Sequence, residues 1–167
     1  EPIAELAGLR RQAVEITGAS ATDNVVSFGT ERVTEIDLVL DVSHASDAWL
    51  SLARGEVGGK LQEVRVGVDV AKGVFYLDRT NGGLQTVRDG GEAQFALRRE
   101  VAYRPADGRV RLHVYLDRSS VEVFVDDGAP AGSFLVFNDP SAQGLALGAT
   151  GTATIASGHL TPLGPAF

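Results

Sequence analysis

The sequence contains no cysteine and no methionine, and only three histidines. Without cysteine the chain can form no disulfide and offers no thiolate for catalysis or for zinc. The histidines, His44, His113 and His159, stand far apart and lack the spacing of a metal-binding motif. The sequence therefore predicts no cofactor and no metal site. Calcium bound by Asp126 and Asp127 is an alternative, but carboxylates of this kind more often lie in a solvated turn.

The chain also lacks a long apolar run and an excess of basic residues. No apolar stretch approaches the roughly 18 residues of a transmembrane helix, and no signal peptide precedes Glu1. Fifteen basic residues against 22 acidic ones give a net charge of −7, which argues against nucleic acid or an anionic membrane as a partner. We expect an excised or mature piece of a secreted, extracellular protein, with a cytoplasmic origin as the alternative.

What is present indicates one all-β domain. The 167 residues and 44% apolar content suffice for a single core, and 20 scattered glycines suit many short turns. Short alternating segments without intervening helical patterns predict a two-sheet antiparallel β-sandwich of the jelly-roll or lectin-like type, over residues 13–167. The predicted strands are 13–17, 25–28, 33–42, 48–54, 63–71, 93–103, 132–137, 144–149, 153–156 and 159–163, with a turn at 44–47, besides the hairpin described next.

The clearest element is a hairpin within residues 108–128. Two runs, 110–116 and 121–125, alternate apolar with polar residues, and 117–120 connect them. A slip of one residue would bury Glu122 and expose the valines, so the register is well determined. The predicted opposite pairs are Leu116 with Val121, Tyr115 with Glu122, Val114 with Val123, His113 with Phe124, and Leu112 with Val125.

The polar face of this hairpin carries an unusual set of side chains. His113, Tyr115, Glu122 and Phe124 share the face that points away from the valines. Aromatic residues there suggest a surface that a partner or a ligand covers. Loops of the same domain could equally cover it.

Residues 2–11 predict one short helix. Pro2 suits a first helical turn, and Arg10 and Arg11 suit the last. Residues 1–12 are therefore expected to form a linker helix, which either caps the sandwich or contacts another domain. Its apolar stripe consists of Ile3, Leu6 and Leu9.

Three segments in the same order resemble the C-terminal β-sandwich domain of glycoside hydrolase family 32. They are Glu-Leu-Ala-Gly-Leu-Arg at 5–10, Gly-Val-Phe-Tyr-Leu-Asp-Arg-Thr-Asn at 73–81, and Val-Tyr-Leu-Asp-Arg-Ser-Ser-Val-Glu-Val-Phe-Val-Asp-Asp-Gly at 114–128. The family contains invertases, levanases, inulinases and fructosyltransferases. The resemblance extends to about residue 163.

This resemblance implies a non-catalytic domain that packs against a catalytic five-bladed propeller and stabilises it. The family's catalytic motifs, Trp-Met-Asn-Asp-Pro-Asn-Gly, Arg-Asp-Pro and Glu-Cys, lie in that propeller, and a chain without Met and Cys cannot contain the first and last. Residues 138–140, Asn-Asp-Pro, indicate a turn. No catalytic residue is predicted, so the chain is not expected to be an enzyme on its own. The interdomain interface would involve Ile3, Leu6, Leu9, His113, Tyr115 and Phe124.

A second resemblance, to family 66 carbohydrate-binding modules, implies binding of a fructan oligosaccharide or polymer. Asp78-Arg79 and Asp117-Arg118 both end strands, and Glu122 lies close to the second pair. Carboxylates and arginines hydrogen-bond the hydroxyls of sugars, so these five residues form a candidate pocket. The competing and favoured interpretation is that each Asp-Arg pair braces its own turn by a salt bridge and backbone hydrogen bonds.

Overall fold

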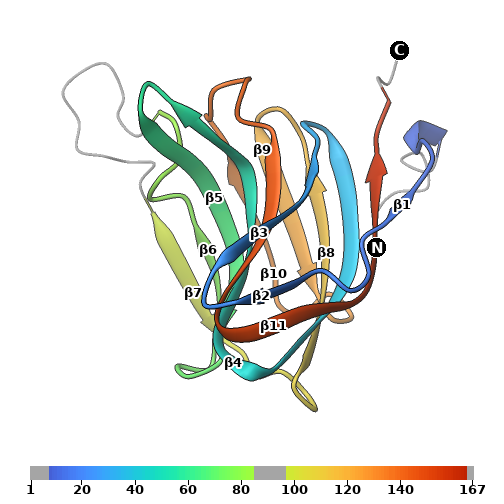
Figure 1. Ribbon diagram of the computed structural model, residues 1–167, viewed down its shortest axis with the longest axis vertical. Coiled ribbons are helices and arrows are strands. Elements are labelled where there is room, and N and C mark those ends of the chain that lie inside the picture. The colour runs from blue at the N-terminus through green and yellow to red at the C-terminus, as the bar shows by residue number, and fades with distance from the viewer. Residues whose placement is uncertain (1–7, 85–96, 165–167) are drawn as a thin grey trace.

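The computed structural model describes residues 8–84 and 97–164, which form antiparallel strands almost throughout (Figure 1). These described residues include no helical segment with the length and hydropathy of a membrane span. The all-β prediction is confirmed. The described strands are β1 (Val14–Glu15), β2 (Ser20–Thr22), β3 (Val25–Thr30), β4 (Thr34–Val57), β5 (Lys60–Asp69), β6 (Val74–Asp78), β7 (Arg98–Ala102), β8 (Arg109–Leu116), β9 (Ser120–Val125), β10 (Ala131–Leu135) and β11 (Gly144–Pro162).

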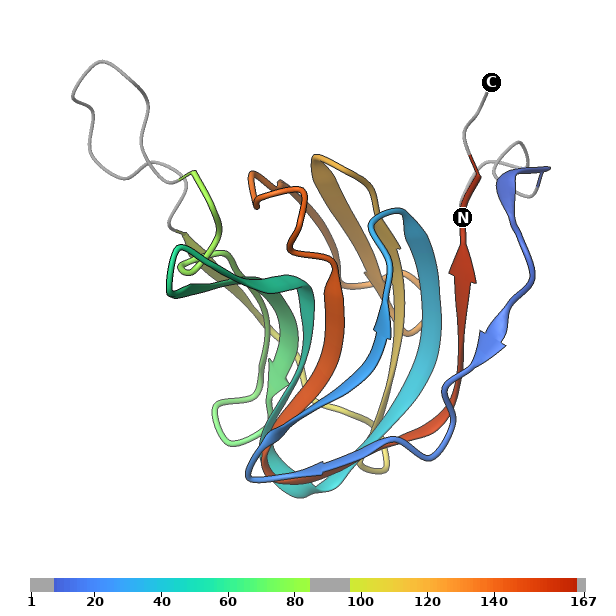
Figure 2. The same ribbon diagram turned by 45° about the horizontal axis from the view of Figure 1, so that its top comes forward.

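Two long strands, β4 and β11, take part in both layers of the sandwich. Residues 34–41 of β4 pair with β8 and with residues 154–162 of β11, whereas residues 47–57 pair with β5 and with the beginning of β11. The first layer therefore has the order β10-β9-β8-β4-β11-β1, and the second has the order β7-β6-β5-β4-β11-β3. Because β4 and β11 curve from one layer into the other, hydrogen bonds link all of these strands into one curled sheet (Figures 1 and 2).

The prediction of a turn at 44–47 is wrong, because the chain bends there between the layers without leaving its strand. These residues lie inside β4, and the three strands predicted between 144 and 163 likewise join into β11. The register between β4 and β11 shifts near Gly151, which marks bulges that let a strand turn a corner without breaking. Gly151 has φ +81°, and a Cβ there would lie 2.4 Å from the carbonyl oxygen of His44. Glycine is therefore required at this point of the bend.

The central hairpin has the predicted register. All five predicted pairs between β8 and β9 are present. Their apolar residues face β4, β5 and β11 in the space between the layers and are almost fully buried, which is what the alternation predicted. The most deeply buried members of the core include Ile36, Leu38, Leu40, Leu50, Leu52, Val64, Val66, Leu112, Val114, Val121, Val123, Leu145, Leu147 and Ile155.

The structure does not support the predicted helix at 2–11. Residues 1–7 lie outside the described residues, and residues 8–9 form only a short 3₁₀ turn. Arg10 instead forms a β-bridge with Leu163. The helix prediction is wrong at Arg10, because its backbone extends the pairing at the end of β11 rather than closing a helical turn.

Candidate functional site

Glu35 of β4 lies at the centre of a hydrogen-bonded group on the outer face of the first layer. Its Oε2 accepts a hydrogen bond from Arg10 Nε at 2.5 Å, and its Oε1 accepts one from Arg10 Nη2 at 2.7 Å. Oε1 also accepts from the hydroxyl of Tyr115 at 2.9 Å and lies 2.7 Å from His113 Nε2. These four residues are called the Glu35 cluster below. The cluster fixes the segment that enters the domain onto the sheet.

Strand pairing explains why these side chains meet. Glu35 stands directly opposite Tyr115 in the β4–β8 pair, and His113 follows on the same face of β8. The Glu35 side chain is only 7% exposed, so its charge depends on these partners. Sequence reasoning missed Glu35 and the role of Arg10. The alternation in 33–42 placed Glu35 on the polar face, but nothing in the sequence showed that β8 would lie beside β4.

The partners of Glu35 keep it ionised. Burial by itself would raise the pKa of this carboxyl, but the hydrogen bonds from Arg10, His113 and Tyr115 outweigh burial, and the pKa lies below its ordinary value of 4.5. Burial and the adjacent carboxylate raise the pKa of Tyr115 to about 12, so its phenol remains a hydrogen-bond donor. Glu35 therefore acts as a permanent acceptor for the incoming arginine.

This lowered pKa predicts a pH-dependent contribution to stability. A carboxyl whose pKa is lower in the folded than in the unfolded chain stabilises the fold above the unfolded value, and loses that stabilisation as the pH falls through the folded value. The difference in unfolding free energy between the wild type and Glu35→Gln should therefore be constant above the ordinary pKa of 4.5 and shrink below it. Urea unfolding of both proteins from about pH 6 to about pH 3 measures this, and other carboxylates cancel in the difference. A difference that is independent of pH would contradict an ionised Glu35.

A groove of about 820 Å³ lies beside the Glu35 cluster. The two described ends of the chain meet there, since the backbone N–H of Gly164 donates to the carbonyl of Leu9 at 2.7 Å. We call it the entry groove, because the chain enters the domain at its rim. Its lining includes Leu9, Tyr115, Asp117, Arg118, Glu122 and residues 162–164.

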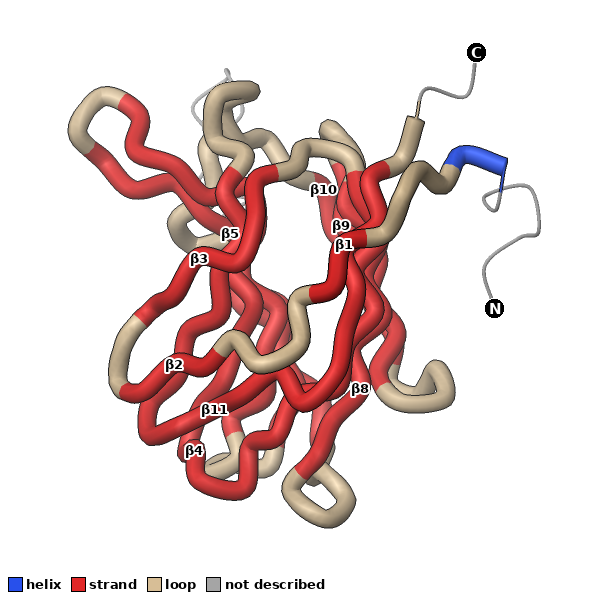
Figure 3. The backbone as a smooth tube through the Cα atoms, turned by 45° about the vertical axis from the view of Figure 1, so that its right-hand side comes forward, coloured by secondary structure: helices blue, strands red, loops and turns tan. Residues whose placement is uncertain are grey.

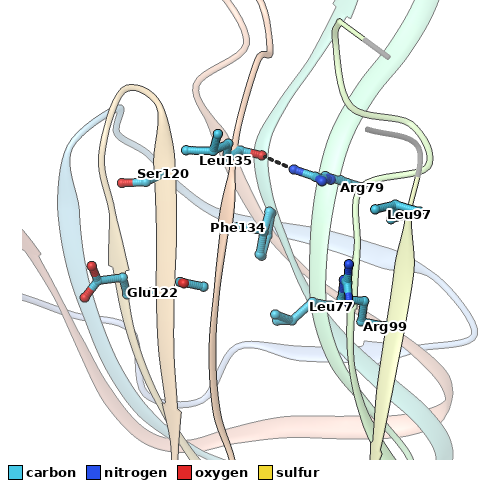
Figure 4. A pocket seen from close by; sticks show the side chains of 9 residues that line it. Leu77, Arg79, Leu97, Arg99, Ser120, Glu122, Phe134 and Leu135 are labelled. Carbon is cyan, nitrogen blue, oxygen red and sulfur yellow. Dashed lines mark hydrogen bonds between the residues drawn. The ribbon is translucent and has the colours of Figure 1, made fainter. Parts of the chain in front are cut away.

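A second hollow, of about 650 Å³, lies at the open edge of the sandwich, between β6 and β7 of the second layer and β9 and β10 of the first. Figure 4 shows its two walls, with two arginines on one side and Glu122 on the other. Arg79 Nη1 donates to the carbonyl of Leu135 at 3.0 Å, and this bond bridges the two layers. We call this hollow the edge cleft. Its lining includes Leu77, Arg79, Arg99, Glu122, Phe134 and Leu135.

The structure does not bring the five predicted sugar-binding residues into one pocket. Asp78 and Arg79 are neighbours at a strand end and line different hollows: Arg79 lines the edge cleft, and Asp78 lines a small pocket of about 170 Å³ with Glu63 and Arg65. Asp117 and Arg118 line the entry groove. Of the five predicted residues, Glu122 is the one that lines both the groove and the cleft.

Asp78 and Asp117 confirm part of the competing interpretation, in which each Asp-Arg pair braces its own turn. Asp78 Oδ1 accepts a hydrogen bond from the backbone N–H of Thr80 at 2.8 Å, and Asp117 Oδ1 accepts one from that of Arg118 at 2.7 Å. These bonds brace the turns after β6 and β8, as short polar side chains commonly do. The ion pair of Asp78, at 3.6 Å, is made with Arg98 across the neighbouring strand.

The predicted interface residues have different outcomes. Ile3 and Leu6 lie outside the described residues, and Leu9 lines the entry groove. Their predicted contact with another domain stays a prediction. The other three lie together on the outer face of the first layer: the rings of His113 and Tyr115 are 4.8 Å apart, and Phe124 lies 6.4 and 6.5 Å from them. Contacts within the domain thus account for part of this aromatic face.

A second buried carboxylate was also missed by the sequence reasoning. Glu63 of β5 is 1% exposed and accepts hydrogen bonds from the Ser51 hydroxyl, from Arg54 Nη1 at 2.6 Å and from Arg65 Nε at 2.8 Å. The Arg65 guanidinium also stacks over Trp49, 4.5 Å from the ring centre. These contacts form a polar cluster on the outer face of the second layer.

One of the two carboxylates considered for calcium, Asp126, is held by hydrogen bonds within the domain. Asp126 accepts hydrogen bonds from the Tyr103 hydroxyl at 2.7 Å and from the backbone N–H of Arg111 at 3.0 Å. Among residues 8–84 and 97–164, no group of three or more acidic or histidine side chains could hold a metal ion.

Comparison with known families identifies the family to which this chain belongs. The family described as "Glycosyl hydrolases family 32 C terminal" matches residues 5–162. The chain belongs to this family. The match confirms the resemblance predicted from residues 5–10, 73–81 and 114–128.

Relatives of this family 32 C-terminal domain are longer proteins. The chain is 30% identical to a levanase of Bacillus subtilis over 97% of its own length but only 24% of that protein. It is 31% identical to a sucrose-6-phosphate hydrolase of Zymomonas mobilis over 81% of its length and 24% of that protein. The chain thus spans about a quarter of these curated relatives.

Solved structures agree with the observed fold. An exo-inulinase from Aspergillus awamori superposes on 97% of this chain with a TM-score of 0.76 and 23% identity, and the match covers 31% of that protein. A sucrose-6-phosphate hydrolase from Lactobacillus gasseri gives a TM-score of 0.71 at 19% identity, over 99% of this chain and 31% of that protein. The 167 residues therefore correspond to the non-catalytic C-terminal domain, and the catalytic domain is absent from them.

Proposed function

We propose that this domain stabilises the catalytic domain of a glycoside hydrolase that acts on fructans or sucrose, and that it packs against that domain through the entry groove. The Glu35 cluster is the observation that carries the proposal. It clamps the segment that leads to the rest of the protein onto the outer face of the first layer, beside an open groove. The substrate class is supported by the names of the relatives, a levanase and a sucrose-6-phosphate hydrolase.

The groove has the character of an interdomain contact. Its lining mixes apolar side chains such as Leu9 with the charged side chains of Arg118 and Glu122, and contacts between domains of one chain are commonly of this mixed kind. Such contacts bury on the order of 600–1,500 Å². Two domains of one chain are held at a high effective concentration near each other by the covalent connection. The two domains can therefore pack stably even if their intrinsic affinity for each other is low.

Thermal unfolding of the two-domain protein and of this chain alone tests the proposal. The sandwich should unfold at a higher temperature in the two-domain protein, and Leu9→Asp should remove most of that difference. Leu61→Asp is the matched control, because this exposed leucine lies in the β4–β5 hairpin that projects from the molecule (Figure 3). Equal unfolding temperatures with and without the catalytic domain would refute mutual stabilisation.

A second function, binding of a fructan chain end in the edge cleft, is favoured by one observation. The cleft combines Arg79 and Glu122, two of the predicted sugar ligands, with Arg99 and the partly buried ring of Phe134. Guanidinium and carboxylate groups beside an aromatic face suit a sugar ring. Titration with a levan oligosaccharide, followed by backbone NMR, should shift resonances of Arg99 and Glu122. The absence of any shift at the cleft would exclude this second function.

A further inference from the structure

The chain enters and leaves the domain through two adjacent segments. Residues 9–11, called the entering segment below, run antiparallel to residues 162–164, called the leaving segment, and Arg10 forms its β-bridge with Leu163 at the middle of both. Figures 1 and 2 show the two segments along the same side of the molecule, beyond the end of β11. The last described residues of the chain therefore lie beside the first.

Backbone hydrogen bonds hold the entering segment to the leaving segment. The N–H of Arg11 donates to the carbonyl of Pro162 at 2.9 Å, and the N–H of Gly164 donates to the carbonyl of Leu9 at 2.7 Å. In the described part of the chain, no backbone hydrogen bond joins the entering segment to β4 itself. The backbone of the entering segment thus meets the sheet through the leaving segment.

The leaving segment is the middle one of three paired stretches. On its other side Pro162 stands opposite Thr34 of β4, and the N–H of Leu163 donates to the carbonyl of Val33, the residue before β4, at 3.1 Å. A stretch at the edge of a sheet has a pairing neighbour on one side only. The entering segment occupies such an edge, so its place on the sheet depends on the leaving segment.

The ion pair between Arg10 and Glu35 reaches across the leaving segment. Glu35 stands opposite Thr161 in the β4–β11 pair, whereas Arg10 lies on the far side of Leu163. The leaving segment therefore sets the distance between the backbone of Arg10 and β4. The Arg10 side chain is 43% exposed, and a long exposed side chain loses conformational entropy when an ion pair holds it in one geometry. The ion pair secures the entering segment after the backbone has positioned it.

We infer that the leaving segment positions the domain that precedes this one, and that loosening the leaving segment releases the entering segment. The inference rests on the proposed packing against the catalytic domain, and it specifies which part of the chain controls that packing. The leaving segment is suited to this role because it also lines the entry groove, together with Leu9. A change in the leaving segment should therefore alter the contact between the domains without disturbing the core.

Gly164→Pro in the two-domain protein tests this inference, with Gly164→Ala as the matched control. Proline has no backbone N–H, so it removes the bond to Leu9. Alanine keeps the N–H, and its Cβ would come no closer than 3.4 Å to another group, which is an ordinary contact. The measured quantity is the rate at which trypsin cuts after Arg10 or Arg11, with the products identified by mass spectrometry. Loss of one backbone hydrogen bond should raise this rate about fivefold in the proline variant and leave it unchanged in the alanine variant.

Thermal unfolding then separates this inference from the proposed function. In Gly164→Pro the temperature difference between the two-domain protein and the chain alone should shrink, because the preceding domain is held less firmly. The chain alone should unfold at nearly the wild-type temperature, since a frayed end segment leaves the core intact.

The other outcomes overturn the inference in different ways. An unchanged trypsin rate in Gly164→Pro would show that the ion pair alone holds the entering segment. A faster rate with an unchanged temperature difference would show that the leaving segment does not position the preceding domain. A faster rate in Gly164→Ala as well would assign the effect to the added methyl group. If the wild type gains no stability from the catalytic domain, the proposed function fails and the positioning role fails with it, even if trypsin cuts Gly164→Pro faster.

Discussion

Replacement of Glu63 by alanine is expected to lower the free energy of unfolding by about 3 kcal/mol. This carboxylate is 1% exposed and holds Arg54, Arg65 and the hydroxyl of Ser51. Without it, the buried Ser51 hydroxyl loses its acceptor, and two guanidinium groups are left facing each other at the sheet surface. Both arginines remain partly exposed, at 28% and 33%, so water relieves some of the loss and the effect stays at the lower end for a broken buried pair.

Urea unfolding at neutral pH measures this effect, and Glu100→Ala is the matched control. Glu100 carries the same charge and also contacts Arg98 and Lys72, but its side chain is 36% exposed. Exposed ion pairs contribute little, so the control should lose less than about 1 kcal/mol. Similar losses in the two variants would show that Glu63 acts only as a surface charge.

Val123→Asp should prevent the domain from folding, or lower its stability by at least about 4 kcal/mol. Val123 is fully buried between the layers, opposite Val114. The core around it is apolar, so a carboxylate there would find no hydrogen-bond partner and would carry the full cost of its desolvation.

Glu122→Ser is the control for this position, because it changes the adjacent residue. Glu122 points to the opposite face of β9 and is exposed, so we expect its replacement to change stability by no more than about 0.5 kcal/mol. Circular dichroism and urea unfolding of the two variants measure the contrast. A stable Val123→Asp protein, or an unfolded Glu122→Ser protein, would show that the hairpin has the other register.

The alternation of apolar and polar residues determined by itself the two strands of the central hairpin and their register. In residues 110–125 both faces of the hairpin demand the same pairing, so a slip would cost buried valines on one side and a buried Glu122 on the other. The family, too, could be recognised from short segments, because 73–81 and 114–128 are contiguous strand-and-turn units whose residues lie next to one another in the chain.

Other features depended on contacts between distant segments. Residues 44–47 continue the strand rather than form a turn because β11 runs alongside β4 and bends with it at Gly151. The predicted helix failed at Arg10 for the same reason, since its periodicity was correct for a helix but Leu163 and Glu35 offered better partners. A local sequence pattern contains no information about a pairing partner that lies more than a hundred residues away and competes with the locally favoured structure.

The candidate sites were decided almost entirely by the tertiary structure. The sequence identified Asp78, Arg79, Asp117 and Arg118 as polar residues at strand ends and Glu122 as a residue on the polar face of the hairpin. It did not show which of these residues share a hollow. Consecutive residues of a strand point to opposite faces, so Asp78 and Arg79 separate even though they are neighbours in the chain. Glu35, by contrast, meets Arg10 only because β11 pairs with β4 and Arg10 pairs with Leu163 just after β11. The sequence determines which face each side chain takes, and the packing of strands from distant parts of the chain determines what that side chain meets there.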